Sequence, residues 1–86
     1  MNELEKLREK IDELDKIIAT AYAQRLDVVH KIGEYKKINN IAVLDSGREE
    51  LVYNNVKNCA KNYQEEICDL YQFIMQYSKN KQSAKQ

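Results

Sequence analysis

The sequence contains no proline, no tryptophan and only two glycines among its 86 residues. The lack of proline removes the strongest helix breaker and, with a charged fraction of 33%, favours long helices over a sheet. Acidic and basic residues balance at 14 each, so we expect neither a nucleic-acid surface nor a lipid-binding patch. No apolar run approaches the roughly 20 residues that span a bilayer, and the charged N-terminus lacks the apolar core of a secretory signal.

Cysteine and histidine, the side chains typical of zinc sites and of nucleophile–base pairs, are also scarce. Cys59 and Cys68 lack a CxxC spacing, and His30 is the only histidine, so we predict no metal site and no cofactor. Cys59 lies on an apolar helical stripe, where a reduced thiol usually serves as a small core residue. Both cysteines are interpreted as structural thiols of a protein in the reducing cytoplasm.

A heptad pattern dominates the first part of the chain. It predicts one very long helix from about Glu3 to about Ile38, roughly 50 Å in length. Gly33 inside this helix costs about 1 kcal/mol relative to alanine, which indicates either close approach of another backbone or simple tolerance. Nine of the ten seam positions are apolar or aromatic and the tenth is Arg25: Leu4, Leu7, Ile11, Leu14, Ile18, Ala21, Arg25, Val28, Ile32 and Tyr35.

Two shorter helices are predicted after Asn39–Asn40. The first begins at Ser46–Glu49, which fits a capping box, with Asp45 alongside to complement the helix dipole. The break before the last helix is placed at Asn62–Gln64. Residues 1–86 are predicted to form a single domain, with an ordered core at about 3–82 and a polar tail at 83–86.

These lengths predict the assembly as well as the fold class. Two short helices cannot cover a first helix of this length, and soluble monomers rarely leave a long apolar stripe in water. The expected fold is therefore all-α, with three helices per chain that intertwine in a two-fold homodimer.

Arg25 is the main candidate functional residue. A buried charge is costly unless it is paired, so Arg25 should face an anion; a partner carboxylate, or a side chain that snorkels to water, would explain it equally simply. Lys36 lies about three turns further along the same face, roughly 16 Å away.

Arg8 lies about 25 Å from Arg25, too far to share a small ligand within one chain. In an antiparallel pair with a dyad near Lys16 and Ile17, Arg8 of one chain would lie opposite Arg25 of the other.

Several short motifs occur in an order and spacing that resemble a known family. They are Leu7-Arg8, the IDELD run at Ile11 to Asp15, Arg25, the IGEYK segment ending at Lys36, D-x-x-R-E from Asp45 to Glu49, and S-x-x-x-Q from Ser78 to Gln82. From Leu4 to Gln82 the chain resembles the all-α chorismate mutases, which form small intertwined dimers. It departs from the family pattern in a shorter interval between Glu49 and Ser78, and in lacking the glycine often found between the second and third helices.

The resemblance implies a binding role for each polar position at the cationic end of the site. Arg8 from the partner subunit and Arg25 would bind the two carboxylates of chorismate, with Ser78 assisting. Lys36 and Gln82 would hydrogen-bond the ether oxygen of the breaking C–O bond. Such a site suits an intramolecular rearrangement, which needs a compact conformer and stabilisation of developing charge.

The resemblance implies a second, acidic corner. Glu49, helped by Asp45, would hold the ring hydroxyl of the substrate, and Arg48 would tune this corner. Considered alone, Asp45, Ser46 and Glu49 are explained as well by a helix cap. The residues implied to be catalytic are Arg25, Lys36, Glu49 and Gln82.

The implied function is that of an isomerase that converts chorismate to prephenate in phenylalanine and tyrosine biosynthesis, without covalent catalysis. Two alternatives remain open. An isochorismate-pyruvate lyase on the same fold would use similar cations, although Glu49 favours the mutase. A non-catalytic helical dimerisation module would explain the heptads, but not Arg25 in the seam.

Overall fold

The computed structural model of the chain describes residues 2–83, and the arrangement is entirely helical apart from one connection. Helix α1 spans Glu3–Ile38, and a second helical segment follows from Ser46 to Ser83. That segment consists of α2 (Ser46–Ala60), a single 3-10 turn η1 (Lys61–Tyr63) and α3 (Gln64–Ser83). The all-α class is thereby confirmed. No helix within residues 2–83 combines the length and apolarity needed to cross a membrane.

Helix α1 has the predicted limits because its ends carry the expected signals. The Asn2 side chain accepts a hydrogen bond from the Glu5 backbone N–H at 2.8 Å, which caps the first turn. At the other end Asn39 caps the helix, and Asn40 takes a left-handed φ of 55° that turns the chain away. Lys36 and Lys37 lie in the last turn, where cations complement the dipole.

The start of α2 differs from the prediction. The N-cap is Asp45, whose Oδ1 accepts a hydrogen bond from the Arg48 backbone N–H at 3.0 Å, and Ser46 is already the first helical residue. The prediction of a capping box with Ser46 as the N-cap is therefore wrong, because the N-cap lies one residue earlier, at Asp45. Both residue types cap well, and Asp45 is the one with the extended backbone that a cap requires.

The turn between α2 and α3 lies at Lys61–Tyr63, close to the predicted break. Lys61 has a φ of 50°, a backbone conformation that favours glycine. This chain lacks a glycine between its second and third helices, and the structure shows that a lysine takes the strained position in this turn. Ser83 ends α3, whereas the prediction assigned it to the polar tail; residues 84–86 of that tail lie outside the described residues.

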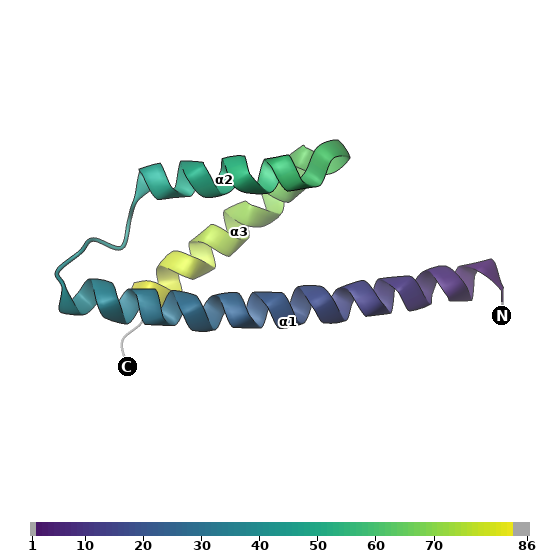
Figure 1. Cartoon of the computed structure of the whole chain (residues 1–86), viewed down its shortest axis with the longest axis horizontal. Helices are drawn as coiled ribbons and strands as arrows, with labels where there is room; N and C mark the ends of the chain where they lie inside the picture. The colour runs from purple at the N-terminus through teal and green to yellow at the C-terminus, as the bar shows by residue number, and fades with distance from the viewer. Residues whose placement is uncertain (1, 84–86) are drawn as a thin grey trace.

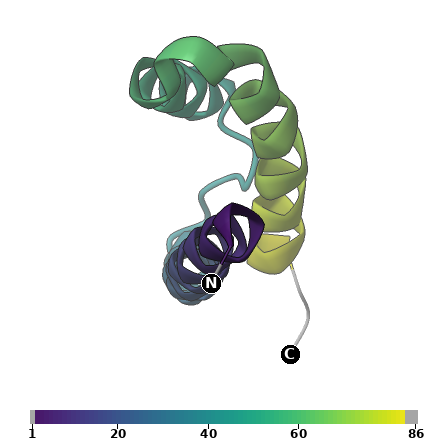
Figure 2. The same ribbon diagram turned by 90° about the vertical axis from the view of Figure 1, so that its right-hand side faces the viewer.

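Helix α3 is the element that connects the fold. It packs against α2 near its start and crosses the C-terminal half of α1 near its end, whereas within residues 2–83 no Cα atom of α1 lies within 8 Å of one in α2 (Figures 1 and 2). The close crossing occurs at Gly33, where an added Cβ would lie 2.7 Å from Gln82 Cα. Close approach of another backbone is thus confirmed as the reason for Gly33.

The arrangement leaves much apolar surface uncovered. Every residue from Asn2 to Ala21 is exposed, and in Figure 1 this part of α1 extends beyond the crossing with α3. Only Val29, Val52 and Met75 are buried hydrophobic residues among those described. Cys59 is also exposed, which corrects its interpretation as a core residue of the chain, while Cys68 is half-buried.

Candidate active site

Arg25 lies where α3 crosses α1, and α3 supplies its surroundings. Its Nη1 donates a hydrogen bond to Ser78 Oγ, its Nη2 lies 3.7 Å from the Met75 sulfur, and its guanidinium carbon lies 5.9 Å from the centre of the Tyr71 ring. Ser78 is 5% exposed, and its hydroxyl donates in turn to the Ile74 carbonyl at 2.8 Å. The guanidinium is therefore held in a fixed orientation by a chain of neutral groups.

No carboxylate lies within ion-pairing distance of Arg25 in residues 2–83. The half-buried guanidinium thus has a hydroxyl, a thioether and an aromatic face as partners, but no counter-charge from the described part of its own chain. A buried ion pair with a carboxylate from residues 2–83 therefore does not explain why an arginine occupies the heptad seam. An arginine that has only neutral partners is suited to bind the carboxylate of a ligand, because its planar guanidinium retains unused N–H donors.

Arg25 also lines an apolar groove between α1 and α3 with a volume of about 500 Å³. The walls include Ile18 and Tyr22 from α1, and Phe73 and Tyr77 from α3. Phe73 is 69% exposed and Tyr77 is 59% exposed, so this wall of the groove is largely open to solvent. A cation at the edge of an apolar groove interacts more strongly with an anion once that groove is covered, because the local dielectric falls.

Lys36 is half-buried at the end of α1 and is held by the connection to α2. Its Nζ donates a hydrogen bond to the Val43 carbonyl at 2.9 Å, and the backbone N–H of Ile41 donates to the Lys36 carbonyl at 2.8 Å. The ammonium keeps two further donors. Lys37 is exposed, as expected for a residue rotated about 100° from the Lys36 face.

The predicted acidic corner lies at the start of α2. Asp45 uses one carboxylate oxygen for its cap, which agrees with the helix-cap explanation of this residue and leaves its other oxygen outside that bond. Glu49 is half-buried, and its Oε2 lies 3.4 Å from the Nζ of Lys79. Arg48 is exposed.

Lys79 was not among the residues singled out in the sequence. A lysine in the last part of a polar helix ordinarily indicates solvated charge, and nothing in the spacing distinguishes it from its neighbours.

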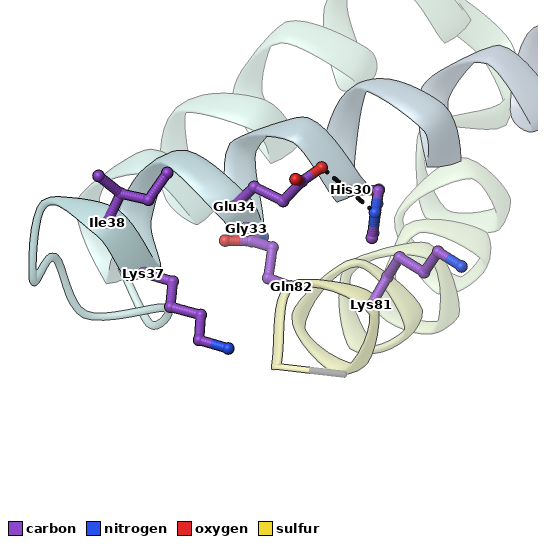
Figure 3. A pocket seen from close by; sticks show the side chains of 7 residues that line it. All are labelled: His30, Gly33, Glu34, Lys37, Ile38, Lys81 and Gln82. Carbon is purple, nitrogen blue, oxygen red and sulfur yellow. Dashed lines mark ion pairs between the residues drawn. The ribbon is translucent and has the colours of Figure 1, made fainter. Parts of the chain in front are cut away.

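Gln82 lies on the last turn of α3, directly against Gly33 (Figure 3). Its Oε1 is buried and has no hydrogen-bond partner within the described part of the chain. A buried polar atom of this kind is uncommon in folded proteins and is often found at functional sites. A small cavity of about 170 Å³ lies beside this crossing, and His30 and Glu34 are among the residues that line it. Figure 3 shows the side chains of its lining residues.

The structure brings together some of the predicted site residues and not others. Arg25 and Ser78 are in direct contact, and Glu49 contacts α3 through Lys79. Arg8 is exposed in the uncovered half of α1, about 25 Å along the helix from Arg25. Within one chain the structure thus provides a set of two fixed cations, Arg25 held by α3 and Lys36 held by the connection to α2. Such a set can bind an anion and stabilise negative charge that develops in a reaction.

Comparisons with known proteins give a consistent result. Residues 7–83 match the family model described as chorismate mutase type II. A chorismate mutase from Methanocaldococcus jannaschii is 28% identical over 82 residues, which cover 92% of this chain and 83% of that protein. No solved structure gave a significant match.

Proposed function

Because the chain belongs to the type II chorismate mutase family, it is an isomerase that acts on chorismate, and we propose that it does so in a site built around Arg25 and completed by a second copy of the chain. The observation that carries this proposal is the environment of Arg25. Its guanidinium is oriented by Ser78 and has only neutral partners among the described residues, while chorismate carries two carboxylates.

We assign the carboxylates of the substrate to Arg25, assisted by Ser78, and to Arg8 of the partner subunit. Lys36 and Gln82 donate to the ether oxygen, on which negative charge develops as the C–O bond breaks. Support for Lys36 comes from its fixed position, since the Val43 carbonyl holds one of its three N–H donors and leaves two. Donors positioned in advance stabilise developing charge without reorganisation at the moment of reaction.

We assign the ring hydroxyl to the corner formed by Glu49 and Asp45, with Arg48 adjusting its charge. The reaction itself is intramolecular, so the protein has to hold chorismate in a compact conformer and stabilise the polarised transition state. No covalent intermediate is required. Prephenate is the product, and the family implies a place in phenylalanine and tyrosine biosynthesis; a cytoplasmic location stays a prediction.

The homodimer is supported by the surface of the protomer. It exposes 7273 Å², whereas a globular monomer of 10.1 kDa exposes about 5,300 Å². Its radius of gyration is 16.2 Å, against about 12 Å for a compact domain of this length. The excess of roughly 2,000 Å² is of the size that one subunit of an obligate dimer buries. Antiparallel pairing of two α1 helices would cover this surface and place Arg8 near Arg25 of the other chain.

An activity assay with purified protein tests the reaction. Loss of chorismate with formation of prephenate is expected, whereas release of pyruvate from isochorismate would favour the lyase on the same fold. A protein that melts at the same temperature with and without a chorismate-like dianion would favour the non-catalytic dimerisation module, because selective binding to the folded state must raise the midpoint.

Subunit exchange tests the shared site. Arg8→Ala and Arg25→Ala proteins should each be inactive, and a mixture should recover activity because mixed dimers contain one intact site. The measurement is chorismate turnover after exchange, with exchange itself demonstrated by mass-tagged subunits. Lack of recovery in demonstrably mixed dimers would refute the assignment of Arg8 to the partner subunit.

A further inference from the structure

The ion pair between Lys79 and Glu49 connects two different helices. Lys79 Nζ of α3 lies 3.4 Å from Glu49 Oε2 of α2, whereas the other ion pair among residues 2–83, His30 with Glu34, lies within α1. The two side chains of the α2–α3 pair are 33% and 24% exposed, so water screens this pair less than a pair on an open surface.

The position of Lys79 on α3 makes this contact notable. Lys79 follows Ser78 directly, and successive residues of a helix point about 100° apart. A single turn of α3 thus contacts α1 through Ser78 and Arg25, and contacts α2 through Lys79 and Glu49. Because α1 and α2 do not pack against each other in the described residues, this turn and the connection after α1 together set the distance between the cationic and acidic parts of the site.

We propose that Lys79 is a positioning residue that holds the Glu49 carboxylate by its Oε2 and leaves Oε1 to accept a hydrogen bond from the ring hydroxyl of the substrate. This inference rests on the proposed function, since it requires Glu49 to bind that hydroxyl. A carboxylate has acceptor sites on both oxygens, so the ammonium and the hydroxyl can bind at the same time. Lys79 touches Glu49 and is not assigned any contact with the substrate.

A charge argument supports the same role. Glu49 would be repelled by the carboxylates of a dianionic substrate, and this repulsion grows as water is excluded. An ammonium on the far oxygen of Glu49 offsets the negative charge while it preserves an acceptor for the hydroxyl. Without Lys79, Glu49 would be free to rotate and would weaken substrate binding by its charge.

The test compares Lys79→Met with Lys79→Arg and with the control Lys81→Met. Lys81 lies two residues further along α3, is exposed and forms no ion pair within residues 2–83. We expect Lys79→Met to lower kcat/KM for chorismate by about fivefold, mainly through KM, and Lys79→Arg to restore most of the loss. Lys81→Met should match the unmodified protein.

Two further measurements separate positioning from a merely structural tie between α2 and α3. With a chorismate analogue that lacks the ring hydroxyl, the effect of Lys79→Met should shrink to less than twofold, because Glu49 then has no hydroxyl to bind and only its uncompensated charge still acts on the substrate carboxylates. In a Glu49→Gln background, Lys79→Met should also have little further effect, since residues that act as one unit are not additive.

The outcomes distinguish this inference from the proposed function. An unmodified protein that does not convert chorismate would overturn both. An active protein in which Lys79→Met behaves like Lys81→Met would overturn only the role of Lys79. Equal losses with and without the ring hydroxyl, or losses that Lys79→Arg does not restore, would show that Lys79 acts through helix packing alone.

Discussion

Replacement of Gly33 by alanine tests the crossing on which the site depends. In an isolated helix this change would stabilise α1 by about 1 kcal/mol, because glycine is a poor helix former. In the folded chain the added Cβ would lie 2.7 Å from Gln82 Cα and 2.9 Å from Gln82 O. Both atoms belong to the backbone of α3, so no side-chain rotation can relieve the contact.

The size of the effect follows from these distances. Carbon atoms pack comfortably at about 3.5–4 Å, so the end of α3 must move by about 1 Å. Overpacking of this kind typically costs about 1–3 kcal/mol, which outweighs the gain in helix propensity. A displacement of about 1 Å in a group that contacts the reacting atoms can reduce the rate by about 10²-fold. Gly33→Ala should therefore lower both the melting temperature and kcat, through the position of Gln82.

Gly47 provides the matched control. A Cβ at Gly47 would meet Asp45 Oδ1 at 3.6 Å, an ordinary contact, and Gly47 has no left-handed φ. Gly47→Ala should leave activity intact and raise the melting temperature slightly. Thermal melting and steady-state kinetics of both variants check the reasoning. If Gly33→Ala were as active as the unmodified protein and melted at a higher temperature, the close crossing would not exist in solution.

Two further predictions concern Lys36 and Gln82, the proposed donors to the ether oxygen. Lys36→Ala should lose about 10²–10³ in rate while the exposed Lys37→Ala changes little, and equal rate constants for the two variants would show that the wrong face of α1 has been assigned. Gln82 can donate at any ordinary pH, whereas a glutamate must be protonated to donate and has an ordinary pKa of about 4.3, so activity of Gln82→Glu should shift towards acid. Coincident profiles of kcat/KM against pH for the two proteins would exclude contact between Gln82 and the ether oxygen.

The long helix could be predicted accurately because its signals are local and agree with one another. The heptad continues without a break to Tyr35, no proline interrupts it, and Asn39 and Asn40 end it. The cap of α2 could not be assigned so well, because Asp45 and Ser46 are both good capping residues. The choice between them depends on the path of the connection, in which Val43 is held by Lys36.

In the candidate site, too, features set by local spacing could be predicted from the sequence, whereas contacts between residues far apart in the sequence could not. Spacing along α1 placed Arg25 and Lys36 on the face that becomes half-buried, and left Lys37 exposed. The partner of Glu49 could not be predicted in this way. Lys79 is 30 positions away in sequence, and the contact depends on how the turn at Lys61–Tyr63 directs α3 back along α2.

The uncovered apolar stripe of α1 and the groove beside Arg25 are best understood together. The groove beside Arg25 is walled by Ile18, which belongs to the same heptad column as Leu4 and Ile11. Those side chains are exposed in the protomer, so a second chain that covers the column would extend over the groove as well. Covering the groove would lower the dielectric around Arg25 and strengthen its attraction for a carboxylate. The proposed dimer would therefore supply stability and an active environment through one interface, and loss of that interface would remove both.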